Sequence, residues 1–152
     1  MRRVSGTHTY DDVLRAADVV VCATSARSPV FDSALLRNDV VVAAVGSHEP
    51  NARELDAPLL NRATVVVEDV ATALREAGDI VMAIADGAMT ADDSVSMRDV
   101  VTGAVTLPGD RPLVFKSVGM SWQDLVVAVR SSVAADRPVC WYRRTCRRPT
   151  MP

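Results

Sequence analysis

The chain has 152 residues, a net charge of −2 and 49% hydrophobic residues, values that describe one ordinary globular domain. The weak charge and an aromatic content of 4% argue against a nucleic-acid partner. The three cysteines lack metal-ligand spacing, and no signal peptide or membrane-length apolar run is visible, so we expect no metal site, no membrane partner and a cytoplasmic location.

The first half of the chain alternates between helix signals and apolar runs. Thr9 and Asp12 have the spacing of a capping box, and Asp32 is placed to cap a second, short helix. The apolar runs lack polar alternation, which favours strands of a parallel sheet that are buried on both faces. The predicted elements are helices at about 10–17 and 33–37 and strands at 18–24 and 40–45.

The second half repeats this alternation, although the signal is weaker from residue 80 to residue 109. Asp56 and Asp69 are placed as helix caps, and Gly78 is placed to end the second of these helices. Ser121 is placed to cap a final amphipathic helix with the apolar stripe Trp122, Leu125, Val126, Val129 and Val133. The predicted elements are helices at 57–62, 69–77, about 92–103 and from 121, and strands at 64–67 and 113–115.

Strands separated by helices indicate βαβ units, right-handed crossovers and a mostly parallel sheet. A dinucleotide-binding domain normally opens with strand, Gly-x-Gly-x-x-Gly and helix, and no such motif occurs in this sequence. We therefore expect residues 1–137 to form a partial doubly wound, Rossmann-like α/β domain with flanking helices, its first strands and Gly-rich loop missing. Residues 138–152, which include four arginines, are expected to form an irregular basic tail.

Four segments occur in an order that is typical of one family. They read Ala-Asp-Val-Val-Val-Cys-Ala-Thr-Ser at 17–25, Val-Gly-Ser-His-Glu-Pro-x-x-Arg-Glu-Leu-Asp at 45–56, Glu-Ala-Gly-Asp at 76–79 and Val-Phe-Lys-Ser-Val-Gly-Met at 114–120. Together they resemble the ornithine cyclodeaminase/mu-crystallin family. Members of that family join an N-terminal substrate and dimerisation domain to a Rossmann domain that binds NAD or NADP. The resemblance covers about residues 11–135 and is to the second part of the Rossmann domain only.

The resemblance implies a cofactor site built from residues at or just after the ends of three of the predicted strands. From the residues alone, Thr24 can equally cap its own strand end, and Gly46 can simply end a strand. Ser117 and Gly119 can likewise belong to an ordinary helix entry. The predicted cofactor-binding residues are Ala23, Thr24, Ser25, Val45, Gly46, Ser47, Ser117, Val118 and Gly119.

His48 is the one candidate catalytic residue. Its position matches an Asp that works at the reacting carbon of the cyclodeaminases, and Ala52 matches a Lys of those enzymes, so the resemblance is closer to the ketimine reductase and mu-crystallin branch. A histidine that titrates near neutral pH can protonate an imine or hold a carboxylate. The alternative is a solvent-facing loop histidine without a role.

Other polar side chains receive structural interpretations. Lys116, the only lysine, is expected to form a surface ion pair with Asp124 or another acid. Arg53 and Glu54 are expected to hold the shape of their loop, and Cys22 is expected to be a small buried side chain.

The resemblance implies a truncated family protein, derived from an NAD(P)-dependent oxidoreductase of cyclic imino acids or amino acids and not active alone. One alternative is a non-catalytic fragment or binding module that associates with a partner chain through an open sheet edge. Another is an ornithine cyclodeaminase that is completed by another polypeptide. The expected ligands are a nicotinamide dinucleotide and a small amino or imino acid, and a homo-oligomer or a partner chain is possible.

Overall fold

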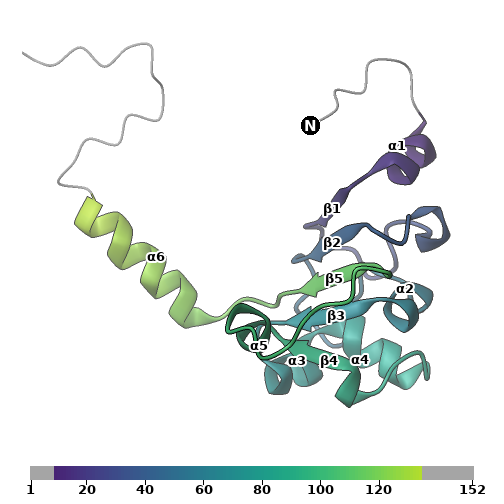
Figure 1. Ribbon diagram of the computed structural model, residues 1–152. Coiled ribbons are helices and arrows are strands. Elements are labelled where there is room, and N and C mark those ends of the chain that lie inside the picture. The colour runs from purple at the N-terminus through teal and green to yellow at the C-terminus, as the bar shows by residue number, and fades with distance from the viewer. Residues whose placement is uncertain (1–8, 135–152) are drawn as a thin grey trace, which may run out of the picture. The chain divides into compact units, whose positions relative to one another are not determined.

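The computed structural model describes residues 9–134, which contain a five-stranded, all-parallel sheet (Figure 1). The strands are β1 (Val19–Cys22), β2 (Val41–Ala44), β3 (Thr64–Val67), β4 (Ser94–Ser96) and β5 (Leu113–Lys116). Their order across the sheet is β1-β2-β5-β3-β4, so β5, the last strand within residues 9–134, lies in the centre. The predicted α/β class and parallel sheet are confirmed.

Three helices begin at caps that the sequence predicts. The Thr9–Asp12 capping box is present, and the carboxylates of Asp56 and Asp69 accept backbone N–H groups at the starts of their helices. The helices are α1 (Tyr10–Ala16), α2 (Ala57–Arg62), α3 (Val70–Glu76), α4 (Gly78–Ala85), α5 (Met97–Val101) and α6 (Ser121–Ala134), with short 3₁₀ turns at η1 (Ser33–Leu35) and η2 (Ala91–Asp93).

One face of the sheet is buried across its three central strands. Val42, Val65 and Val114 share this face, since paired residues of parallel strands point to the same side, and each is at most 1% exposed. They pack with Leu59 of α2 and Ile80 of α4 in one apolar cluster. The hydrophobic core therefore lies between this face and the helices.

The other face of the sheet is exposed to solvent at β1, which contradicts the expectation of strands buried on both faces. Val19 and Val21 are 60% and 66% exposed, and their neighbours Val41 and Ala43 on β2 are half-buried. The physical reason is that β1 is an edge strand of the described sheet, and nothing in residues 9–119 packs over its outer valines.

Two elements between residues 77 and 103 differ from the sequence prediction. Gly78 does not simply end a helix, because α4 starts at Gly78 itself, directly after the Ala77 cap of α3. The segment 94–96 is a strand and not part of a helix, since Val95 pairs with Val66 on the edge of the sheet. A three-residue strand carries too little periodicity to be recognised, and tertiary pairing overrides local preference there.

The helix α6 belongs to a separate compact unit that begins at Met120. The predicted amphipathic helix is confirmed, although Ser121 is its first helical residue and not its cap. The apolar side chains Trp122, Leu125, Val126 and Val129 are all more than half exposed. The predicted tail 138–152 and the side chain of Val133 lie outside what the structure describes.

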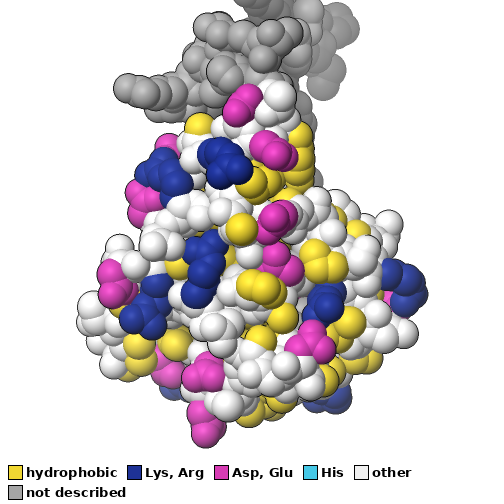
Figure 2. Space-filling view, turned by 90° about the vertical axis from the view of Figure 1, so that its right-hand side faces the viewer, with side chains coloured by type: hydrophobic (Ala, Val, Ile, Leu, Met, Phe, Trp, Pro, Cys, Tyr) yellow, Lys and Arg dark blue, Asp and Glu magenta, His cyan; other side chains and the backbone are white. Residues whose placement is uncertain are grey.

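The described surface mixes both signs of charge. Figure 2 shows basic and acidic side chains interspersed over the face seen from the right of Figure 1, without a broad region of one sign. Arg37, for example, pairs with both Asp18 and Asp39. No helix within residues 9–134 is long and apolar enough to cross a membrane. The expected cytoplasmic location stays a prediction.

Gly78 is expected to be intolerant of any side chain. A Cβ at this position would overlap the carbonyl oxygens of Ala52 and Glu49, and these atoms belong to backbone that cannot easily move. Gly78→Ala should lower the free energy of unfolding by about 1–3 kcal/mol, the usual range for overpacking. Gly109→Ala is the matched control, because a Cβ there meets open space. Equal urea melts of the two variants would contradict this account.

The exposed edge at β1 is expected to drive self-association of the isolated chain. An unpaired strand edge beside apolar side chains is a template for pairing with another chain. Val21→Lys should weaken self-association at least tenfold, measured by sedimentation velocity. Val101→Lys on α5 is the control, because Val101 is 78% exposed but follows the strand at the opposite edge. A wild-type chain that stays monomeric at high concentration would show that this edge is inert.

Candidate functional site

The carboxyl ends of three adjacent strands bring the predicted cofactor residues to one edge of the sheet. β1, β2 and β5 are neighbours, and Cys22, Ala44 and Lys116 stand side by side at their ends. The pairing continues past the strands, since Val45 N–H donates to Cys22 O and Ser117 N–H donates to Ala44 O. The segments 23–25, 45–47 and 117–119 therefore begin next to one another, where ligands bind in open parallel sheets.

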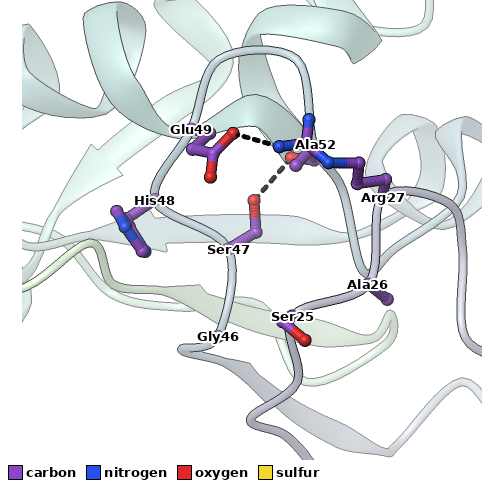
Figure 3. Close-up of a pocket in the computed structure, with 8 residues that line it drawn as sticks. All are labelled: Ser25, Ala26, Arg27, Gly46, Ser47, His48, Glu49 and Ala52. Carbon is purple, nitrogen blue, oxygen red and sulfur yellow. Dashed lines mark hydrogen bonds and ion pairs between the residues drawn. The ribbon is translucent and has the colours of Figure 1, made fainter.

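A small open pocket lies at this edge, between the loops that follow β1 and β2 (Figure 3). Its volume is about 70 Å³. Since complete small-molecule sites usually measure about 300–1,000 Å³, this pocket has room for one part of a larger ligand. It is lined by Ser25, Ala26 and Arg27 from the first loop and by Gly46, Ser47, His48, Glu49 and Ala52 from the second.

A buried carboxylate joins the two loops behind the pocket. Glu54 is 0% exposed, and its carboxylate accepts the N–H of Thr24 at 2.6 Å, the Oγ1–H of Thr24 at 2.8 Å and the N–H groups of Gly46 and Ser47 at 2.8 and 3.3 Å. Burial acts to raise the pKa of Glu54, but these hydrogen bonds outweigh it and hold that pKa below its ordinary value. The interpretation that Glu54 holds its loop is consistent with these contacts.

A buried ion pair supports the same loop from the other side. The Nζ of Lys116 lies 2.9 Å from Oδ2 of Asp79 and donates to the carbonyl oxygen of Ser47 at 2.6 Å. Both charged side chains are 0% exposed. The other oxygen of Asp79 accepts the N–H groups of Glu54 and Leu55 at 2.7 and 2.8 Å. The expected surface pair of Lys116 with Asp124 is therefore wrong, because β5 lies in the centre of the sheet and directs Lys116 towards the packed helices.

Contacts within the chain account for two of the predicted cofactor residues. Thr24 gives both its N–H and its hydroxyl to Glu54. A Cβ at Gly46 would overlap the backbone of Thr24, so glycine is required there by packing. Their predicted contact with a cofactor remains a prediction.

The residues after β5 form a second polar group at the same edge. Ser117 donates its hydroxyl to Glu68, which follows β3, at 2.8 Å, and also accepts the N–H of Gly119 at 3.1 Å. Gly119 has a φ of +76°, a value that glycine adopts readily. Val118 is half-buried against the core. Glu68 was not singled out from the sequence, because its proximity to Ser117 depends on the strand order.

His48 lies at the rim of the pocket and is exposed to solvent. Within the described part of the chain, no side-chain hydrogen bond or ion pair of His48 is seen. Arg27 forms an ion pair with Glu49 at 2.7 Å (Figure 3). Arg27 also donates to Oδ1 of Asn51 at 3.4 Å. The rim thus carries two basic side chains, of which only Arg27 is held by a partner.

Other residues near the site are structural. Cys22 is 3% exposed, and burial, together with the charges of Glu54 and Asp79, raises the pKa of its thiol to about 11. It is therefore a poor nucleophile at neutral pH, as expected of a small buried side chain. Arg53 pairs with Asp86 at 2.6 Å at the outer side of the loop. Among residues 9–134, no group of three or more acidic, Cys or His side chains is placed to hold a metal.

Residues 2–135 match the model of the ornithine cyclodeaminase/mu-crystallin family, and the chain belongs to this family. The ketimine reductase mu-crystallin of Mus musculus is 32% identical over 120 residues, which are 79% of this chain and 36% of the relative. The Delta(1)-pyrroline-2-carboxylate/Delta(1)-piperideine-2-carboxylate reductase of Azospirillum brasilense is 38% identical over 129 residues, which are 84% of this chain and 39% of the relative. The family prediction is confirmed.

The fold is also similar to that of a solved structure, which contains a bound cofactor. The iminosuccinate reductase of Paracoccus denitrificans, in complex with NAD⁺, has a TM-score of 0.75 and 30% identity to this chain. The match covers 83% of this chain and 39% of that one. The chain spans well under half the length of the relatives that it matches.

The free energy of unfolding is expected to depend on Glu54 and on pH. Glu54→Gln replaces an oxygen that accepts N–H groups with an NH₂ group, so it should cost about 1–3 kcal/mol at pH 7. Because the folded carboxyl titrates below its ordinary value of 4.5, its stabilising effect is present above that pH and is lost as the pH falls below it. The variant should show a weaker loss of stability on acidification.

Glu49→Gln serves as the control for that measurement, since Glu49 is an exposed loop carboxylate whose side chain is 48% exposed. Its effect on unfolding should stay below about 0.5 kcal/mol. Urea unfolding between pH 3 and pH 7 compares the three chains. Identical acid profiles for wild type and Glu54→Gln would show that the buried carboxylate is not the group that titrates.

Proposed function

We propose that this chain is the nicotinamide-side part of a dinucleotide-binding domain, in a family protein derived from an NAD(P)-dependent reductase of cyclic imino acids. The observation that carries the proposal is the meeting of segments 23–25, 45–47 and 117–119 at the carboxyl edge of three adjacent strands. The chain matches well under half of each reductase, so the activity of a whole reductase would need further parts.

The polar groups at this edge fit the nicotinamide end of a dinucleotide better than its pyrophosphate. A phosphate site needs free backbone N–H groups, and those of Thr24, Gly46 and Ser47 are taken by Glu54. The pocket of about 70 Å³ suits part of a cofactor and not all of it. When bound, a nicotinamide supplies the hydride, and the protein supplies binding and orientation.

The rim of the pocket suits a ligand that carries a carboxylate. Arg27 provides a planar guanidinium, and its ion pair with Glu49 is exposed, so exchange for a ligand carboxylate costs little. His48, on the same rim, is the group proposed to give a proton to an imine nitrogen. An ornithine cyclodeaminase activity, completed by another polypeptide, is less well supported, because His48 and Ala52 replace the Asp and Lys of those enzymes.

A binding module is the second candidate function. It is favoured by the open edge at β1, where Val19 and Val21 are largely exposed. In that case the chain associates with a partner chain or a second copy through this edge, and the pocket has no ligand.

Nuclear magnetic resonance of the full chain separates the two candidates. Reduced nicotinamide mononucleotide should shift the amide signals of Gly46, Ser47 and Ser117, whereas 5′-AMP should not, because only the nicotinamide half fits this edge. We expect dissociation constants in the millimolar range, since the adenylate half adds no contacts. NADH and NADPH should bind no tighter than the mononucleotide.

Ala26→Trp should abolish these shifts by filling the pocket. Ala71→Trp, at an exposed position of α3, is the matched control and should bind like wild type. If the nicotinamide causes no shifts, or if 5′-AMP shifts the same signals equally, the proposed site is wrong. Micromolar binding of NADH would show that a phosphate site exists elsewhere in the chain.

A further inference from the structure

Lys116 has features that a purely stabilising ion pair does not need. It is the only lysine of the chain, and its ammonium group is buried between Asp79 and the carbonyl oxygen of Ser47. A buried ion pair is a poor source of stability, because losing hydration costs each charge several kcal/mol and a well-packed apolar pair often serves as well. What an apolar pair cannot do is bind the carbonyl oxygen of a loop.

The backbone that Lys116 binds leads directly to the pocket. Ser47 O accepts from Lys116, Ser47 N–H donates to Glu54, and Ser47 Oγ–H donates to Ala52 O. All three polar groups of this residue are therefore held. The peptide that carries the Ser47 carbonyl also carries the N–H of His48, so Lys116 binds the peptide group that joins these two residues. Figure 3 shows the side chains of Ser47 and His48 on this loop.

Asp79 extends the same restraint to the end of the loop. It accepts the N–H groups of Glu54 and Leu55, and it lies in the first turn of α4. Glu54 in turn accepts the N–H of Thr24, which follows β1, and the N–H of Gly46, which follows β2. One buried chain of contacts thus runs from β5 through α4 to both loops that line the pocket.

We propose that Lys116 is a positioning residue, which fixes the Ser47–His48 peptide through the Ser47 carbonyl and so holds the nicotinamide-side pocket in its binding geometry before any ligand arrives. The proposal rests on the proposed function for its ligand and on the contacts above for its geometry. It assigns Lys116 no contact with the ligand.

Two variants separate positioning from stability. Lys116→Met keeps the length of the side chain but leaves the Asp79 carboxylate unpaired, so it should unfold at a clearly lower urea concentration. Lys116→Met/Asp79→Asn removes both charges, while Asn Oδ1 can still accept the N–H groups of Glu54 and Leu55. The double variant should therefore recover most of the lost unfolding midpoint.

The double variant should regain stability, but its loop at residues 46–48 should stay less ordered than in wild type. In the double variant, the Gly46 and Ser47 amides should exchange with solvent at least tenfold faster than in wild type, while that of Val66 in β3 stays unchanged. The residual dipolar coupling of the His48 N–H should shrink through averaging. The affinity for reduced nicotinamide mononucleotide should fall at least tenfold. A double variant with wild-type exchange, coupling and affinity would show that Lys116 is structural only and would overturn the proposal.

A measurement on the unmodified chain keeps the proposal testable if the double variant does not fold. Because the chain has one lysine, its ¹⁵Nζ signal needs no assignment. The Lys116 ammonium protons should exchange slowly and show cross-peaks to the His48 N–H, and a fast-exchanging ammonium would overturn the proposal. If wild type does not bind the nicotinamide, the proposed function fails, while the exchange and coupling measurements still decide the role of Lys116.

Discussion

The loop after β2 depends on charges that the fold buries. Glu54, Asp79 and Lys116 are each almost completely inaccessible, and every buried charge must find partners, because an unpaired one costs several kcal/mol. Their partners come from the ends of β1 and β2, from the loop itself, from the start of α4 and from β5. The contacts of these three charges consequently fix the positions of these segments relative to one another, and the pocket lies between two of them.

The same constraint explains why two glycines are needed near the site. Gly46 and Gly78 each sit where a Cβ would overlap backbone atoms, of Thr24 in one case and of the loop 49–52 in the other. Close packing of the loop against β1 and α4 is therefore sufficient to require glycine at both positions. For function, the consequence is a small pocket with defined geometry, in which the N–H groups of Gly46 and Ser47 are already engaged by Glu54.

Local chemistry made much of the secondary structure predictable. The bounds of α2 and β3 agree with the sequence prediction, because an Asp cap and a short β-branched run mark them clearly. The strand β4 was missed, since a three-residue strand is created by pairing with β3 and not by its own pattern. The buried state of Lys116 was also missed, because a lysine after a short apolar run resembles a surface residue until its strand is placed in the centre of the sheet.

The sequence by itself determined the caps at Thr9, Asp32, Asp56 and Asp69, the parallel α/β class, the family and the residues that gather at the carboxyl edge, since these depend on neighbours along the chain or on motif order. Only the tertiary structure decided that β5 lies between β2 and β3, that one sheet face opens at Val19 and Val21, and that Lys116 meets Asp79 beneath the loop of His48. The physical reason is that strand order and burial arise from contacts between segments far apart in the chain, such as the bond that joins Lys116 to Ser47 across 69 residues. No local pattern encodes the partner of such a contact.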